Sequence, residues 1–258
     1  MHNHQIIIIG MGEMAGVFAR GLLKSGYTIT PVRRDDDIDA VAATIPNPDL
    51  VLVAVGENDL QQTLQTLPQP WKKSVALLQN ELLPNQWLPY QLQPSVISVW
   101  FEKKKGQDFK VLVPSPIFGP GAEIIQQALA HLEIPSWIVT SSEEMLFELV
   151  RKNVYILMTN IAGMALPQGS NVEALWQQHH HFATTIANEV IDLQFAITGQ
   201  AFDRTALLKG VESAIYGDLQ HQCMGRSAPA RLARALTQAT ELKLELIELS
   251  RLSSAQNR

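Results

Sequence analysis

The sequence predicts an α/β domain over residues 1–140, followed by an all-α domain over residues 141–258. Three observations support this order: short apolar runs alternate with helical patterns in the first half, a capped helical run begins near residue 141, and later segments all have helical periodicity. A chain of 258 residues also exceeds the usual size of one domain, roughly 100–200 residues. Two domains are therefore expected.

Composition narrows the classes of function. Hydrophobic residues make up 46% of the chain and charged residues 17%, which is enough apolar material for two cores. The net charge of -5 argues against a nucleic-acid partner, and we interpret the lysine run at 103–105 as a solvated loop. The apolar run at 6–9 is too short for a signal peptide, and no run of about 18 apolar residues predicts a membrane span. The single cysteine, Cys223, excludes an internal disulfide and favours the cytoplasm.

The first domain is expected to contain a parallel sheet covered by helices. Residues 5–10, QIIIIG, are typical of a strand buried on both faces, and a helical pattern over 13–25 ends at Gly26. Helical segments between several strand candidates favour parallel connections. The further strand candidates are YTITPVRR (27–34), LVLVAV (50–55), SVALLQ (74–79), SVISVWF (95–101), FKVLVP (109–114) and WIVT (137–140).

The second domain begins with a capped helix. Ser141 precedes Glu144 by three residues, which is the spacing of a capping box. Ser227 and Pro229 likewise mark the start of the last helix. Helices are expected at about 142–165, 171–198, 203–222 and 228–252. The last one carries an apolar stripe that either packs in the core or forms a homodimer surface: Leu232, Leu236, Ala239, Leu242, Leu246 and Leu249.

A glycine-rich loop follows the first strand. In IIIIGMGEMAGVFARGLLKSGY, Gly10 would allow a tight turn, Gly12 would let the backbone approach a pyrophosphate, and Ala15 would let the helix pack closely on the sheet. The N–H groups at the helix start would bind the phosphates. The motif predicts a Rossmann-type dinucleotide site; the alternative is a tight turn that binds nothing. The predicted cofactor contacts here are Gly10, Met11, Gly12, Glu13, Met14 and Ala15.

The end of the second strand distinguishes NAD from NADP. An acidic residue there would hydrogen-bond the ribose 2′-hydroxyl, whereas arginine accommodates a 2′-phosphate. Arg33 and Arg34 come first and are followed by three aspartates, 35–37. We therefore predict NADP; in the alternative, one of the aspartates turns back toward the ribose.

The first helix of the second domain carries Lys152 and Asn160 in the run RKNVYILMTN. Residues eight apart are displaced by roughly 80° around a helix and about 12 Å along it, so the two side chains share one side and can line a cleft. In the alternative, Lys152 extends to solvent and Asn160 bonds neighbouring backbone.

This arrangement resembles the ketopantoate reductase (2-dehydropantoate 2-reductase) family, of which the chain would be a divergent member. The family has a Rossmann domain and then a helical domain of 6-phosphogluconate-dehydrogenase-like type, whose first helix carries Lys-x-x-x-Asn-x-x-x-Asn. Lys152 stands at the lysine position, Ile156 replaces the first asparagine and Asn160 matches the second. The resemblance also implies cofactor contacts from Val55, the last residue of the VLVAV strand, and from Asn80 in LLQNELLP.

A later segment, VESAIYGDLQHQCMGR, resembles the family's Ser-Ser-Met-x-x-Asp-x-x-x-x-x-Arg run. The resemblance implies that Ser213 contacts the substrate, with Asp218 and Arg226 at the later positions. The glutamate that follows the arginine in the family is absent from GRSAPARLAR, and the residues 56–57 replace the lysine expected after VLVAV. These departures indicate an altered substrate, or a protein that binds the cofactor without this chemistry.

The resemblance thus implies an NADP-dependent reductase that transfers hydride to the ketone of a small 2-oxo acid. Lys152 would polarise the carbonyl and protonate the forming alkoxide, while Asn160 and Ser213 would orient the substrate. The glycine loop also resembles that of pyrroline-5-carboxylate reductase, an imine reductase, although that family's Pro-Asn-Thr-Pro loop is absent. A non-catalytic NADP-binding protein is the third interpretation.

No metal site is expected. The histidines at 179–181 are consecutive, so on a helix they point about 100° apart and do not converge on one ion. Cys223 follows His221, but no partner stands at the spacing of a nucleophilic site, and a small packed thiol is expected.

Overall fold

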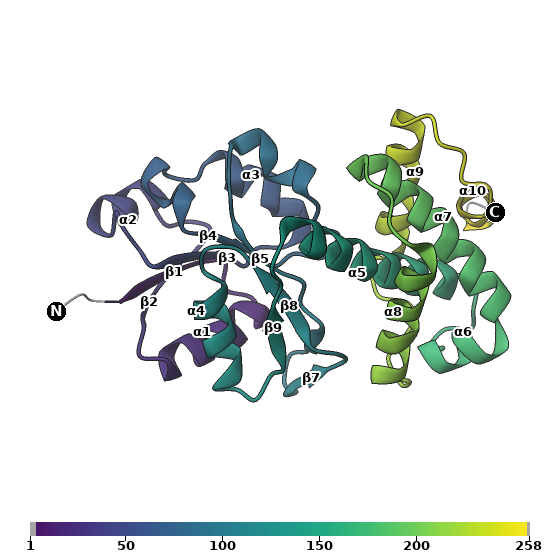
Figure 1. Ribbon diagram of the computed structural model, residues 1–258, viewed down its shortest axis with the longest axis horizontal. Coiled ribbons are helices and arrows are strands. Elements are labelled where there is room, and N and C mark those ends of the chain that lie inside the picture. The colour runs from purple at the N-terminus through teal and green to yellow at the C-terminus, as the bar shows by residue number, and fades with distance from the viewer. Residues whose placement is uncertain (1–3, 257–258) are drawn as a thin grey trace. The chain divides into compact units, whose positions relative to one another are not determined.

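The computed structural model describes residues 4–256 and divides into two compact units, one up to Glu148 and one from Leu149 onward (Figure 1). The division falls within the long helix α5 (Ser142–Gly163). The expected boundary at residue 140 lies just before the start of this helix. Within residues 4–256, no helix has both the length and the apolar character that crossing a membrane requires.

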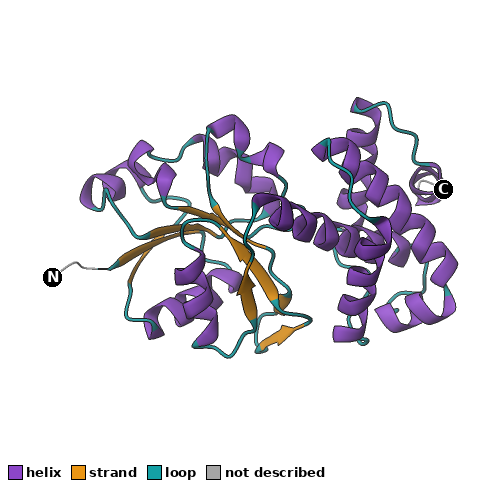
Figure 2. Ribbon diagram, viewed as in Figure 1, coloured by secondary structure: helices purple, strands orange, loops and turns teal. Residues whose placement is uncertain are grey.

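The first unit is built on a seven-stranded sheet with the order β2-β1-β3-β4-β5-β8-β9 (Figure 2). The strands β1 to β5 run parallel to one another. Their side chains are buried on both faces at the centre, as the apolar run in β1 predicts, and Ile6, Ile7 and Ile8 are at most 1% exposed. The bounds are β1 (Gln5–Ile9), β2 (Thr28–Val32), β3 (Leu50–Val53), β4 (Val75–Leu77), β5 (Ser95–Ile97), β8 (Ser115–Phe118) and β9 (Ser136–Ile138).

The sheet is mixed, which corrects the expectation of a parallel sheet. β8 runs antiparallel to β5, pairing Ile97 with Ile117, and β9 runs parallel to β8. The segment 109–114 does not enter this sheet, because β7 (Phe109–Val111) pairs with β6 (Phe101–Lys103) in a separate hairpin. β8 was not expected from the sequence, since it contains Pro116 and proline within a run argues against a strand.

Helices cover both faces of this sheet: α1 and α4 lie on one side, α2 and α3 on the other (Figures 1 and 2). α1 and α4 pack with their backbones unusually close, because a Cβ atom at Gly21 of α1 would lie 2.2 Å from the carbonyl oxygen of Ala128 in α4. The bounds are α1 (Glu13–Lys24), α2 (Ile38–Thr44), α3 (Leu60–Gln65) and α4 (Ala122–Ala130), with 3-10 turns η1 (Glu57–Asp59), η2 (Gln69–Lys73), η3 (Pro84–Gln86) and η4 (Leu88–Tyr90).

The second unit is helical, with two breaks that the sequence did not predict. The expected helix 171–198 is interrupted at His179, whose backbone leaves the helical region. The expected helix 228–252 is interrupted at Lys243, which has a φ of +55° and ends the preceding helix. This unit contains α5 from Leu149 onward, and the helices after it are α6 (Val172–Gln178), α7 (His180–Thr198), α8 (Arg204–Gly217), α9 (Ala228–Glu241) and α10 (Ile247–Gln256).

The second break divides the apolar stripe of the last expected helix. Leu232 and Ala239 are buried in α9, and Leu246 and Leu249 are buried at α10. Leu242 falls at the connection, where it is 43% exposed, and the neighbouring Ile247 is 65% exposed. Most of the stripe therefore packs in the core, Leu236 is half-buried, and Leu242 forms an exposed apolar pair with Ile247, which lies outside the stripe.

The close approach of α1 and α4 predicts that a side chain at Gly21 destabilises the protein. Gly21→Ala should lower the free energy of unfolding by about 1–3 kcal/mol, because the added methyl group forces the two helices apart. Gly16→Ala is the matched control, since a Cβ atom there has no neighbour within 4 Å and alanine favours the helix by about 1 kcal/mol. Urea unfolding of both variants measures the difference, and equal stabilities would refute the packing argument.

Candidate functional site

Gly10 shapes the loop between β1 and α1. Its φ is +93°, a region that glycine adopts without the steric cost of a side chain, and its N–H donates to the Val32 carbonyl at the end of β2, 3.0 Å away. A Cβ atom at this position would lie 2.9 Å from the Ala54 carbonyl oxygen and 3.1 Å from Cγ1 of Val55. Gly10 therefore fits between the ends of β2 and β3, and the fold brings the predicted residues Gly10 and Val55 together.

Gly12 leaves open space at the start of α1. It is the N-cap residue, its carbonyl accepts from the Gly16 N–H at 3.1 Å, and a Cβ atom on Gly12 would have no neighbour within 4 Å. The N–H groups of Glu13, Met14 and Ala15 precede this first intrahelical bond, so they have no partner within the helix. Ala15 itself is buried, as its expected packing role requires. A small anionic group such as a diphosphate suits this position.

The strand order places this loop where α/β sheets bind ligands. β1 lies between β2 and β3, so the connection from β1 to β2 runs one way across the sheet and the connection from β2 to β3 runs back past β1 in the opposite direction. The gap at the carboxyl ends of the strands on either side of such a reversal is the usual ligand crevice. The residues after β1 and β3 therefore lie at the carboxyl ends of central strands, where a dinucleotide would bind.

Gln79, which the sequence did not single out, holds the ends of β3 and β4 together. It is 5% exposed, and its Nε2 donates to the carbonyl oxygens of Val53, at 2.7 Å, and Val55, at 3.2 Å. The half-buried Asn80 follows it directly. A polar residue that closes the apolar run SVALLQ was the only sequence signal for this role.

Arg33 and Arg34 follow β2 and are exposed. Two of the three aspartates after them bind the chain's own backbone: Asp36 accepts from the Arg33 N–H at 2.7 Å, and Asp37 caps α2 by accepting from two N–H groups at 3.1 Å. These contacts engage two of the three carboxylates that the NAD alternative would direct to the ribose, and the third, that of Asp35, is exposed. Arg34 also pairs with Asp59, 3.2 Å away, which is the last residue of the turn η1 that follows β3.

Lys152 lies in the buried part of α5. Its exposed fraction is 4%, so it does not extend to solvent as the alternative interpretation supposed. Burying a charged ammonium group is costly unless other groups in the protein compensate its charge. Its position is therefore typical of a functional group or of a member of a buried polar network.

Asn160 is engaged within the second unit. Its Nδ2 donates to the Ile156 carbonyl at 2.9 Å, and its Oδ1 accepts from the Gly225 N–H at 3.3 Å and from Nη1 of Arg231 at 3.0 Å. The bonds tie α5 to the start of α9, and they use one of the two amide hydrogens. Arg231 is a contact that the sequence did not predict. Ser213 lies on α8 and is exposed, away from the buried side of that helix.

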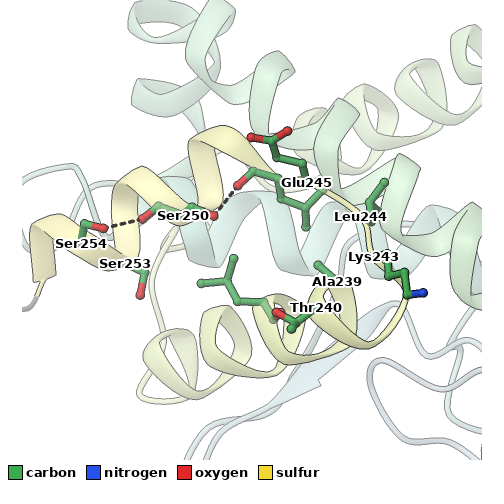
Figure 3. A pocket seen from close by; sticks show the side chains of 10 residues that line it. Ala239, Thr240, Lys243, Leu244, Glu245, Ser250, Ser253 and Ser254 are labelled. Carbon is green, nitrogen blue, oxygen red and sulfur yellow. Dashed lines mark hydrogen bonds between the residues drawn. The ribbon is translucent and has the colours of Figure 1, made fainter.

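The cysteine, the histidine run and the hollow beside α9 and α10 make contacts that serve packing or the helix backbone. Burial raises the pKa of Cys223 to about 12, so its thiol is protonated at neutral pH and is a poor nucleophile. His180 packs edge-on against Trp176, with ring centroids 4.3 Å apart. A hollow of about 610 Å³ lies beside α9 and α10, but the hydroxyls of Ser250 and Ser254 in it donate to carbonyls of their own helix (Figure 3).

Comparisons with known proteins agree with this architecture. No protein-family model and no curated protein matches the sequence. A probable 2-dehydropantoate 2-reductase from Bacillus subtilis is 17% identical with a TM-score of 0.68, covering 97% of this chain and 98% of that chain. A dimeric ketopantoate reductase from Staphylococcus aureus is 14% identical with a TM-score of 0.64, covering 98% and 99%. A D-mandelate dehydrogenase solved with NADH is 12% identical with a TM-score of 0.64, covering 97% and 96%.

These similarities extend over nearly the whole of this chain and of each neighbour. They confirm the predicted fold class, a Rossmann-type domain followed by a helical domain, and they confirm the resemblance at the level of the fold. The chain has the fold of the ketopantoate reductases.

Proposed function

We propose that the protein is a divergent member of the ketopantoate reductase family that uses NADPH to reduce the ketone of a small 2-oxo acid. The observation that carries the proposal is the buried Lys152 on the helix that directly follows a dinucleotide-binding fold. The structural neighbours support it, because they include 2-dehydropantoate 2-reductases and a mandelate dehydrogenase. The substrate proposed is a class, a 2-oxo acid, rather than a single compound.

The first unit would hold the cofactor. Its diphosphate fits the open space at Gly12 and the N–H groups that begin α1. Arg33 and Arg34 would bind the 2′-phosphate, and Val55 and Asn80 would line the crevice beyond the loop. NADPH would supply the hydride that reduces the substrate carbon.

Lys152 would act on the substrate oxygen. Reduction of a ketone leaves negative charge on that oxygen, which an ammonium group stabilises and then protonates. Burial strengthens this electrostatic interaction because little water screens it. Asn160 and Ser213 would orient the substrate by hydrogen bonds, Asn160 with the amide hydrogen that Ile156 does not take.

A dinucleotide-binding protein without catalysis is the second candidate. It is favoured by the engagement of Asn160 Oδ1 with Gly225 and Arg231, and by Ile156 at the position where the resemblance expects a polar group. Titration with NADPH, followed by an assay against a panel of 2-oxo acids and 1-pyrroline-5-carboxylate, distinguishes the candidates. Binding with no turnover on any of these substrates would favour the second.

Replacing Lys152 tests its catalytic role. Lys152→Met, which keeps the length and the apolar part of the side chain, should lower kcat about 10²–10⁴-fold and leave the Kd for NADPH within about twofold. The exposed Lys209→Met is the control for a lost positive charge in the same unit. Circular dichroism checks the fold, and a parallel loss of turnover and cofactor affinity would assign Lys152 a structural or phosphate-binding role instead.

Cofactor preference tests the arginines. The double variant Arg33→Ala, Arg34→Ala should weaken NADPH binding about 10- to 100-fold, because charge-assisted bonds to the 2′-phosphate are lost, and should leave NADH binding within about twofold. Fluorescence titration with each cofactor measures both constants. Equal affinity of the unaltered protein for NADH and NADPH would remove the role proposed for these residues.

We also propose a cytoplasmic homodimer. The free thiol of Cys223 suits a reducing compartment, the exposed Leu242 and Ile247 offer an apolar contact, and one structural neighbour is dimeric. Light scattering should give twice the chain mass of 28.6 kDa, and Ile247→Asp should shift it toward the monomer because a charge enters an apolar contact. A single-chain mass for the unaltered protein would refute the dimer.

A further inference from the structure

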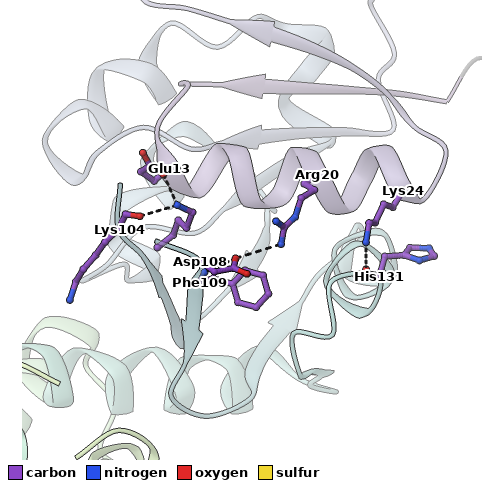
Figure 4. Close-up of polar contacts among 8 residues, drawn as sticks. Glu13, Arg20, Lys24, Lys104, Asp108, Phe109 and His131 are labelled. Atoms are coloured by element: carbon purple, nitrogen blue, oxygen red, sulfur yellow. Dashed lines mark hydrogen bonds and ion pairs between the residues drawn. The ribbon is translucent and has the colours of Figure 1, made fainter. Parts of the chain in front are cut away.

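The hairpin of β6 and β7 is fixed to the first helix of the cofactor domain. Phe101, at the start of β6, is 5% exposed and packs near Phe18 of α1, with ring centroids 6.0 Å apart. On the other strand, the Phe109 ring lies beneath the guanidinium of Arg20, 5.4 Å from its centroid, and Arg20 pairs with Asp108 (Figure 4). The hairpin therefore has a defined position along α1.

This position brings an ammonium group to the first residue of α1. Nζ of Lys103 lies 3.1 Å from Oε2 of Glu13 and donates to the Lys104 carbonyl at 2.9 Å. The Lys103 side chain is 20% exposed and that of Glu13 is 45% exposed. The contact joins two segments 90 residues apart in the sequence.

A small cavity of about 190 Å³ separates the two elements beside this ion pair. Gly12, the N-cap of α1, and Gly16 of α1 form part of one wall, and Lys103 and Phe109 form part of the other. The glycines leave the space open, because no atom lies within 4 Å of the Cβ position at either of them. The hairpin thus borders the space next to the proposed diphosphate position.

A carboxylate at Glu13 has two opposing effects. It stabilises the start of α1 through the helix dipole, but it would repel a diphosphate bound to the N–H groups of the same turn. Lys103 compensates that charge. The other pair facing the cavity, Arg20 with Asp108, is also balanced, so Lys103 decides the net charge around the first turn.

We propose that Lys103 is a positioning residue of the cofactor site: it neutralises Glu13 and holds its carboxylate toward the hairpin, so that the first turn of α1 can accept the diphosphate. This inference rests on the proposed cofactor. It makes the hairpin part of the cofactor site, a role that the lysine run at 103–105, interpreted from sequence as a solvated loop, did not suggest.

The test compares five variants by fluorescence titration at low salt, with NADPH and with NADH. Lys103→Met should weaken binding of both cofactors about tenfold, because it exposes an uncompensated carboxylate at the phosphate position. Glu13→Gln should strengthen binding about threefold, because it leaves the lysine charge in place. The double variant should return to within about twofold of the unaltered protein. Lys105→Met, in the same hairpin, is the matched control and should change nothing.

The outcomes separate this inference from the proposed function. If the unaltered protein binds neither cofactor, both are overturned. If it binds them and Lys103→Met behaves as Lys105→Met does, only the role of Lys103 is overturned. Losses of the same size in Lys103→Met and Glu13→Gln would show a merely structural ion pair. Lys103→Arg should keep affinity near that of the unaltered protein, and thermal unfolding of each variant confirms that it is folded.

Discussion

The chain reversal at Gly10 is the constraint on which the first unit depends. The N–H of this residue bonds the end of β2, and its Cα faces the carbonyl of Ala54 after β3, so the loop is held at the point where the strand order reverses. Any side chain here would meet backbone atoms at 2.9–3.0 Å. The loop therefore lies close to the carboxyl ends of β2 and β3, and α1 begins there. The open space at Gly12 and the ion pair at Glu13 both follow from that starting point.

The second unit is organised by polar groups inside α5. Lys152 and Asn160 are at most 8% exposed, although apolar residues would pack in these places at lower cost. Asn160 recovers part of that cost through its bonds to Gly225 and Arg231, which fix the start of α9. The same bonds restrict what Asn160 offers to a substrate. Asn160, although it matches the motif position, thus stabilises the fold in this chain. Lys152 is the buried group that would stabilise and protonate the substrate oxygen in the proposed reaction.

The sequence predicted the features that local patterns encode. The glycine loop, the buried strand before it and the capped start of α5 depend on neighbouring residues, and all three are present in the structure. β8 was not predicted because it contains Pro116, which argues against a strand. It forms through its pairing with β5 and β9. The ends of α6 and α9 were missed because neither proline nor glycine marks them. Gln79 and Lys103 act on residues 24 to 90 positions away, so no local pattern reveals them.

The proposed cofactor is an anion, so its site must attract negative charge, although the chain as a whole is negatively charged. With a net charge of -5, the protein as a whole repels an anionic dinucleotide, so attraction must come from a few local groups. The start of α1 supplies partial positive charge, Lys103 cancels the carboxylate beside it, and Arg33 and Arg34 stand at the end of β2. In the proposed complex the first two groups would act on the diphosphate that NADH and NADPH share, and the arginines would contact the 2′-phosphate that only NADPH has. Since the arginines are exposed, salt should screen their contribution more than that of the partly buried Lys103. Discrimination between the cofactors should therefore decline with ionic strength before the shared affinity does.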